Sequence, residues 1–147
     1  MGDKAETCIA IFFDNSDGKN SFYVHGALEE KIGKIISIVK TSKEDTIGKK
    51  IAMHISAMSP KSLEEKDLDK KIIDKEMEII KAELSNSGKQ PEIVEKISKG
   101  KINKFISDNT LMNQIWIMDS KKKVSDILKE NDIKILDFIR YKVGEGV

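Results

Sequence analysis

The two histidines are the side chains best suited to acid/base or metal chemistry in this chain of 147 residues. His25 lies in "SFYVHG" and His54 lies in "IAMHISAMSP". An imidazole can transfer protons near neutral pH or bind a metal ion, but a metal site needs further ligands at a suitable spacing. Met58 stands four residues after His54, where a helical metal site would place a second ligand. The spacing therefore favours neither role for His54.

Other catalytic patterns do not occur in the sequence. Cys8 is the only cysteine, which excludes a CxxC motif and an internal disulfide. The sequence has no HExxH motif and no Gly-rich phosphate loop, and no Ser-His-Asp arrangement can be argued from it. We therefore expect a binding protein with no cofactor and no metal, and a small hydrolase is disfavoured.

The neighbouring residues predict different environments for the two histidines. His54 lies between Ile51 and Ile55, beside the apolar stripe of a predicted helix, so we expect a packed or half-exposed residue with a hydrogen-bonded polar tip. His25 ends a predicted strand just before Gly26 and a turn, where side chains tend to point outward. His25 is a candidate binding residue, although the residues alone still favour a structural role.

Charge and hydropathy limit the classes of partner. The 26 basic and 25 acidic residues leave a net charge of +1, which gives no general attraction for nucleic acid. The sequence contains no apolar stretch near the roughly 20 residues of a membrane-spanning helix. We therefore expect no direct nucleic-acid partner and no membrane partner. The length suits one domain, and a single cysteine fits a reducing compartment.

The predicted elements indicate an α+β fold. Alternating and short apolar runs predict strands over 8–13, 21–26, 31–40 and 133–147. A helical period follows the third strand and ends before Pro60, with the predicted buried stripe Ile47, Ile51, Ile55 and Met58. We expect a small antiparallel sheet, made of the three N-terminal strands and the C-terminal strand, packed on helices.

The C-terminal part adds two more detailed expectations. A short helix is predicted over 120–132, with Ser120 or Asp119 as its N-terminal cap. In the last strand, the alternation places Ile135 and Ile139 on one face and Phe138 on the other.

Residues 60–109 have narrow apolar stripes in a mostly charged sequence. "SNSGKQP" interrupts the helical pattern, so the segment predicts an antiparallel helical hairpin that projects from a core formed by 1–59 and 110–147. Flanking side chains such as Ile79 and Ile73 would need cover, and self-association into a homodimer would supply it. The residues assigned to the hairpin and its dimerisation are Leu68, Ile72, Ile73, Met77, Ile80, Leu84, Ile93, Ile97 and Phe105.

Four stretches, in the right order over nearly the whole chain, resemble the elongation factor Ts family. "FYVHGALEEKIGKIISIV" is similar to that family's Y-x-HG hairpin, and "KKIAMHISAMSP" is similar to its IAMH helix. "NSGKQPEIVEKISKGKINKF" resembles its helical-hairpin stretch, and "FIRYKVGEGV" resembles its final strand. Each match is weak alone, but the four together are specific. The chain resembles the C-terminal core subdomain and coiled-coil hairpin of the family.

The resemblance implies a role in translation. In the family, the factor binds elongation factor Tu with GDP and promotes release of the nucleotide. The matched subdomain holds domain 3 of elongation factor Tu, and the hairpin serves self-association or further partner contacts. Carried over position by position, the Y-x-HG motif makes Tyr23, His25 and Gly26 the expected partner-binding residues. The family also implies a bacterial cytoplasm or an organelle of bacterial descent.

The resemblance covers only the C-terminal part of the family's usual chain. The family's TDFV motif, which enters the G domain of elongation factor Tu, does not occur in this sequence. We therefore expect a fragment of a longer factor that supplies docking and dimerisation with little exchange activity. The alternative is a free-standing helical-hairpin scaffold protein with no GTPase partner.

Overall fold

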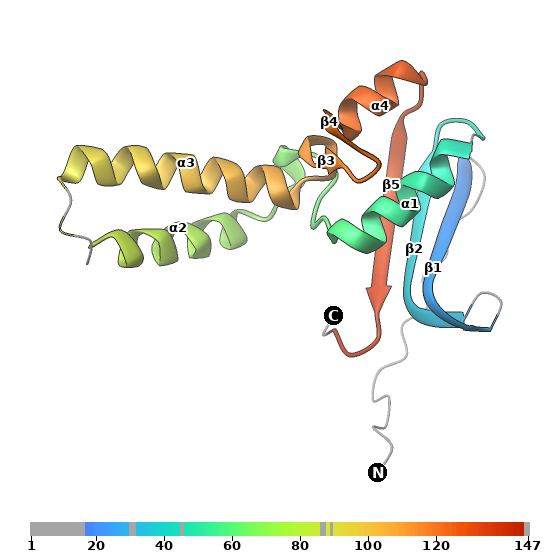
Figure 1. Ribbon diagram of the computed structural model, residues 1–147, viewed down its shortest axis with the longest axis horizontal. Helices are drawn as coiled ribbons and strands as arrows, with labels where there is room; N and C mark the ends of the chain where they lie inside the picture. The colour runs from blue at the N-terminus through green and yellow to red at the C-terminus, as the bar shows by residue number, and fades with distance from the viewer. Residues whose placement is uncertain (1–16, 30–31, 45, 86–87, 89, 146–147) are drawn as a thin grey trace, which may run out of the picture.

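The protein is described from a computed structural model, which places residues 17–29, 32–44, 46–85, 88 and 90–145. Strands and helices are mixed along the chain, and a pair of long helices lies in its middle (Figure 1). The elements in chain order are β1 (Lys19–Glu29), β2 (Ile32–Thr41), α1 (Thr46–Met58), η1 (Glu65–Asp67), α2 (Lys70–Ser85), α3 (Pro91–Asn109), η2 (Leu111–Asn113), β3 (Ile115–Trp116), β4 (Asp119–Lys123), α4 (Val124–Glu130) and β5 (Ile135–Lys142).

A three-stranded antiparallel sheet in the order β1-β2-β5 forms the base of the fold. A second, two-stranded sheet pairs β3 with β4. The α+β class and the small antiparallel sheet packed on helices are thus confirmed. The strand predicted over 8–13 lies outside the described residues.

Helix α1 packs on one face of the three-stranded sheet (Figure 1). Ile51 and Ile55 of α1 are fully buried, and so is Val39 of β2 on the facing side of the sheet. These side chains join Leu111, Trp116 and the apolar face of α4 in one core, which is mostly aliphatic as the scarcity of aromatic residues requires. Pro60 follows the helix end, as predicted, but Met58 is 42% exposed and does not belong to the buried stripe.

A bulge between β2 and β5 changes which β5 side chains face the core. Lys40 pairs with Asp137, but the next residue, Thr41, pairs with Ile135, so β5 contains one extra residue at this point. Ile135 and Phe138 consequently both contact the core cluster. The expectation that Ile135 and Phe138 lie on opposite faces was wrong, because simple alternation ignores the extra residue.

The segment before α4 also differs from expectation. Residues 119–123 form β4, and the helix begins only at Val124, so neither Ser120 nor Asp119 is its cap. The backbone N–H of Lys123 donates to Asp126 Oδ2 at 3.0 Å, which closes the first turn. Lysines at 121–123 are unfavourable at a helix N-terminus, because the N-terminal end of the helix dipole is positive. The same lysines are tolerated in an exposed strand.

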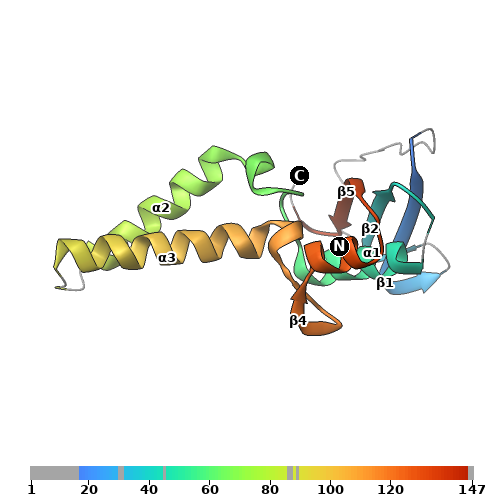
Figure 2. The ribbon, with the colours of Figure 1, turned by 90° about the horizontal axis from the view of Figure 1, so that it is seen from above.

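Helices α2 and α3 form an antiparallel hairpin that extends away from the sheet in both views (Figures 1 and 2). Ile80, Leu84 and Ile102 are buried between them. Lys101 of α3 and Glu83 of α2 form an ion pair at 2.7 Å. The rest of the hairpin surface is mostly charged and exposed, as its narrow stripes predict. None of the described helices is long and apolar enough to cross a membrane.

The assigned hairpin residues divide into three groups. Ile80 and Leu84 form the buried cluster with Ile102, and Ile73, Met77, Ile97 and Phe105 pack against it. Leu68 is buried ahead of α2, and Ile72 is half-buried outside the cluster. Ile93 is 46% exposed, and its neighbour Val94 packs inside the hairpin instead. Ile93 is therefore not a hairpin-core residue, and Ile73 is already covered within the hairpin.

Candidate functional site

Helix α1 leaves one end of the sheet uncovered by any described helix. Its 13 residues span roughly 20 Å, whereas the 11 residues of β1 span roughly 36 Å. The helix crosses the strands diagonally, and β1 and β2 continue past its C-terminal end (Figure 1). Tyr23, Ser37 and Arg140 are paired across the three strands and form one row of the sheet. This row lies under the C-terminal end of α1, because Ser37 Oγ and Ser56 Oγ of α1 form a buried hydrogen bond of 2.7 Å.

The next row along the strands consists of His25, Ile35 and Lys142. It lines a groove of about 640 Å³. We call it the His25 groove. It joins three strands, the end of α1 and the turn between β3 and β4, and its residues are Tyr23, His25, Ile35, Met53, Ser56, Ala57, Ser59, Ile117, Arg140, Lys142 and Glu145. His25 is exposed, and its ring centroid lies 6.3 Å from that of the half-buried Tyr23. An imidazole, a phenol ring and apolar side chains are thus presented together on a rigid sheet.

Gly26 follows His25 in β1 and has a backbone conformation that favours glycine. Its φ of +63° lies in the left-handed region, which glycine adopts without strain. The turn predicted at Gly26 is not present, because β1 continues to Glu29. Gly26 instead lies inside β1, and both β1 and β2 bend sharply toward the connection between them (Figure 1). Gly33 of β2 allows close packing there, because a Cβ atom on it would lie 2.9 Å from the carbonyl oxygen of His25.

Arg140 forms the wall of the groove below α1. Its Nε donates to the carbonyl oxygen of Ser56 at 3.4 Å, and its Nη1 donates to Glu145 Oε2 at 2.6 Å. A cation at this position stabilises the helix, because the C-terminal end of the helix dipole is negative. The hydrogen bonds from Arg140 and Lys142 lower the pKa of Glu145. The ionised Glu145 thus stays attached to β5 and closes the groove.

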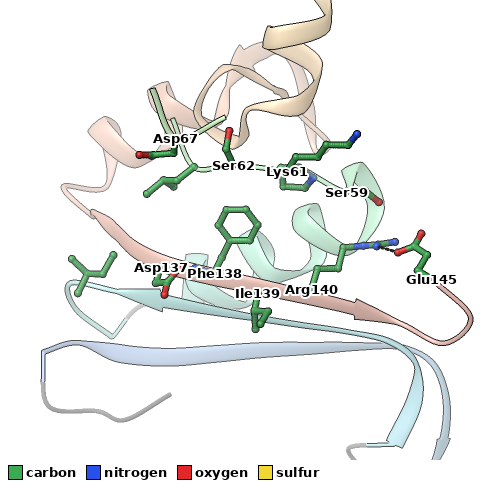
Figure 3. Close-up of a pocket in the computed structure, with 12 residues that line it drawn as sticks. Ser59, Lys61, Ser62, Asp67, Asp137, Phe138, Ile139, Arg140 and Glu145 are labelled. Carbon is green, nitrogen blue, oxygen red and sulfur yellow. Dashed lines mark hydrogen bonds and ion pairs between the residues drawn. The ribbon is translucent and has the colours of Figure 1, made fainter. Parts of the chain in front are cut away.

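A second groove, of about 680 Å³, shares Ser59, Arg140 and Glu145 with the His25 groove (Figure 3). Phe138 points into it from β5, and Ile139 points away on the opposite side of the strand (Figure 3). Lys61, Ser62 and Asp67 line the opposite wall, at the base of the hairpin. This groove lies between the sheet and the segment that enters the hairpin, and it contains none of the predicted partner-binding residues.

His54 is fully buried at the centre of a polar cluster beside the His25 groove. Its ring stacks on Trp116, with the centroids 5.2 Å apart and the planes inclined by 18°. His54 Nε2 lies 2.9 Å from Gln114 Oε1, and the backbone N–H of Ile117 donates to His54 Nδ1 at 3.4 Å. The Gln114 amide nitrogen donates to the carbonyl oxygens of Asp108 at 2.7 Å and Met58 at 3.4 Å. The prediction of a packed, hydrogen-bonded His54 is confirmed.

These bonds define the state of the imidazole. Since Nδ1 accepts a hydrogen bond from the Ile117 N–H, the hydrogen of the neutral ring must be on Nε2, which donates to Gln114 Oε1. Burial lowers the pKa of His54 below its ordinary value of about 6.5, and the hydrogen bond to Gln114 opposes this shift. A neutral ring with both nitrogens occupied is suited to holding neighbouring segments in place.

The His25 groove has a mixed apolar and polar surface. Within the part of the chain that the structure describes, no group of three or more His, Cys, Asp or Glu side chains can hold a metal ion. The His25 groove combines aromatic and aliphatic side chains with exposed polar groups at its edge. Protein interfaces commonly have an apolar centre and a polar rim of this kind.

Sequence reasoning identified only part of this surface. Tyr23 and His25 lie together in the groove, and Gly26 lies at the adjacent bend. Arg140, Lys142 and Ile117 were missed, because they come from the other end of the chain. The antiparallel register of β5 on β2 would have identified the first two, since Arg140 and Lys142 continue the rows of Tyr23 and His25.

The fold combines a small antiparallel sheet, packed helices and a projecting helical hairpin. Comparisons with known proteins define the family. Residues 7–145 match the family described as Elongation factor TS, and the chain belongs to this family. A protein named elongation factor Ts from Psychrobacter arcticus is 39% identical over 125 residues, which cover 85% of this chain and 41% of the relative.

Two further relatives with the same name show how coverage varies. The protein from Thermosipho melanesiensis is 35% identical over 145 residues, which cover 90% of this chain and 73% of the relative. The protein from a Nitratiruptor species is 40% identical over 137 residues, which cover 85% of this chain and 44% of the relative. The chain thus spans less than half the length of some relatives and most of another.

The pKa of His54 predicts a pH-dependent stability. Because the folded-state pKa is lower than the unfolded value near 6.5, the unfolded chain binds a proton that the folded chain does not bind. This contribution to the free energy of unfolding is complete above pH 6.5 and decreases as the pH falls below it, by at most about 1.4 kcal/mol per pH unit. Urea unfolding at pH 7.5 and pH 5.5 should show the decrease in the wild type.

The variant His54→Gln should show a smaller decrease between the same two pH values, because it lacks the titrating ring. His25→Gln retains His54 and serves as the matched control, in which the decrease should remain. Parallel pH profiles for the wild type and His54→Gln would contradict the assignment.

Proposed function

We propose that the chain is the C-terminal part of a translation elongation factor Ts and that its His25 groove binds domain 3 of elongation factor Tu. The observation that carries this proposal is the groove itself. It gathers Tyr23 and His25 of the family's Y-x-HG motif with Arg140 of the FIR motif on one exposed surface. The proposed site is not an enzyme active site. The bacterial relatives favour a bacterial cytoplasm, or an organelle of bacterial descent.

The groove is rigid enough to serve as a preformed docking surface. Tyr23 packs against the core cluster, and Arg140 is hydrogen-bonded on both sides. His25 stands on a strand that is paired with β2 through Ile35. Binding to such a surface loses little conformational entropy, because its side chains are already held in place. The exposed imidazole of His25 is the natural anchor, since it can donate hydrogen bonds to a partner and accept them from it.

Replacing His25 by alanine should weaken binding to elongation factor Tu by at least about tenfold. An anchor at the centre of an interface typically costs about 2 kcal/mol or more when it is truncated, and about 1.4 kcal/mol corresponds to a factor of ten. The exposed position of His25 means that the melting temperature should hardly change. Isothermal titration calorimetry of both chains against elongation factor Tu with bound GDP would measure the difference.

The matched control is Lys49→Ala, on the exposed side of α1, which should bind like the wild type. His54→Ala, an obvious choice from the sequence, is unsuitable because removing a fully buried ring opens a cavity. Equal affinities for the wild type and His25→Ala would exclude His25 from the interface. If the wild-type chain itself does not bind, the alternative of a scaffold protein without a GTPase partner gains support.

This chain should bind elongation factor Tu without accelerating nucleotide release. An exchange factor acts by binding the nucleotide-free partner more tightly than the nucleotide-bound partner. Contact with a remote domain alone supplies little of this preference, and the sequence contains no TDFV motif to reach the nucleotide site. Release of fluorescent GDP, measured at a saturating concentration of the chain, should stay close to the spontaneous rate. Fast release would show that the groove acts on the nucleotide site by another route.

We also infer that the hairpin of α2 and α3 mediates self-association. Ile79 is 45% exposed on α2, and Ile93 is similarly exposed on α3. An apolar groove of about 550 Å³ lies between the helices near their connection and is lined by residues that include Met77, Leu84 and Val94. A second copy would cover these side chains without disturbing the sheet, from which the hairpin projects (Figure 2).

Sedimentation equilibrium tests the role of the hairpin. The intact chain should dimerise, and a variant with residues 62–108 replaced by a short Gly/Ser linker should remain monomeric. Because the linker variant removes much of the chain, Ile79→Glu with Ile93→Glu is the sharper test, since both positions are exposed and the hairpin should still fold. An intact chain that stays monomeric at high concentration would reject the proposal.

A further inference from the structure

The turn between β3 and β4 reaches the His25 groove, although the two strands that it connects are short. β3 has two residues and β4 has five, and a two-stranded sheet of this size is at best marginally stable on its own. The turn nevertheless presents Ile117 and Met118, which are 38% and 48% exposed, and Ile117 lines the His25 groove. Contacts outside the two strands must therefore hold the turn beside the groove.

The cluster around His54 provides those contacts at two consecutive residues. The side chain of Trp116 is buried and stacked on the His54 ring. The backbone N–H of Ile117 donates to His54 Nδ1. The ring thus binds the turn through a side chain and through the main chain, immediately before the segment that reaches the groove.

Gln114 fixes the orientation of the ring and connects it to two helix ends. Its Oε1 accepts the hydrogen bond from His54 Nε2, which prevents the imidazole from flipping and keeps Nδ1 directed at Ile117. Its Nε2 donates to the carbonyl oxygens of Asp108 in α3 and Met58 in α1. These carbonyls lie in the last turns of their helices, where no intrahelical donor is present for them. The Gln114 amide group therefore joins the ends of α1 and α3 and also orients the His54 ring.

We propose that His54 and Gln114 are positioning residues for the docking surface. They place the β3–β4 turn so that Ile117 lines the same groove as His25 and the two side chains meet a partner together. The inference rests on the proposed binding of elongation factor Tu to the His25 groove. Its physical basis is preorganisation, because a turn that is already ordered in the free protein does not lose that freedom on binding.

Two substitutions of the same residue separate hydrogen bonding from packing. His54→Phe keeps an aromatic ring to stack on Trp116 but removes both polar atoms. His54→Gln restores an acceptor and a donor on one carbon, with a separation similar to that of the two imidazole nitrogens. The full chain carrying His54→Phe should bind elongation factor Tu about tenfold more weakly than the wild type, and His54→Gln should stay within about threefold.

Hydrogen exchange of the free chain provides a second readout that does not depend on the partner. The Ile117 amide should exchange faster in His54→Phe than in the wild type, whereas amides at the centre of the sheet, such as that of Val39, should not change. Gln114→Met provides a second route to the same effect, because it removes the acceptor that orients the ring. It should also accelerate Ile117 exchange and weaken binding, and it keeps the proposal testable if the larger ring introduced by His54→Phe prevents folding.

The outcomes distinguish this inference from the proposed function. If the wild type and folded His54→Phe bind equally, His54 does not position the docking surface, and the proposed function stands. If His54→Gln loses as much affinity as His54→Phe, hydrogen bonding is not the cause and the inference is overturned. If the wild type does not bind, the proposed function fails and the docking assignment fails with it. Unchanged exchange at Ile117 in both His54→Phe and Gln114→Met would independently overturn the positioning role.

Discussion

Close contact between α1 and the sheet is the constraint on which the other features depend. Small polar residues make it possible: Ser37 Oγ and Ser56 Oγ share a buried hydrogen bond of 2.7 Å. At the other end of the helix, a Cβ atom on Gly48 would clash with Ser21 Oγ. Larger side chains at these positions would lift the helix from the sheet, since protein interiors are packed without spare volume. The short distance between α1 and the sheet determines how deeply Ile51 and Ile55 enter the core.

The position of α1 determines what its C-terminal end can reach. Arg140 lies below the carbonyl group of Ser56, Gln114 binds the carbonyl group of Met58, and His54 lies one turn earlier. Helix ends leave carbonyl groups without intrahelical partners, and here those groups are satisfied by side chains from distant parts of the chain. The same bonds that complete the helix therefore bring β5, α3 and the β3–β4 turn together. The two grooves are formed by the segments that meet at this point.

The parts of the fold that were predictable are those with local causes. Short apolar runs and period-two alternation predicted β1, β2 and β5, and Pro60 and Pro91 mark the end of α1 and the start of α3. Local patterns also carry ambiguities that only packing resolves. Ile93 and Val94 are adjacent apolar residues, so a one-residue rotation of the stripe exchanges them, and contact with α2 selects Val94. Similarly, the bulge opposite Thr41 cannot be read from the alternation of β5, because it depends on pairing with β2.

The proposed docking surface was harder to predict than the fold, because its residues come together only through packing. Tyr23 and His25 stand two residues apart on one strand, so their common face follows from strand geometry alone. Arg140 and Ile117 join them only through strand register and through the buried ring of His54. A side chain such as Gln114, which is polar and lies in an apolar connector, has no signal in the sequence that distinguishes it from a surface residue. Its burial is the informative observation, because a buried amide is retained only where every donor and acceptor is satisfied, and satisfying Gln114 requires three separate segments to meet.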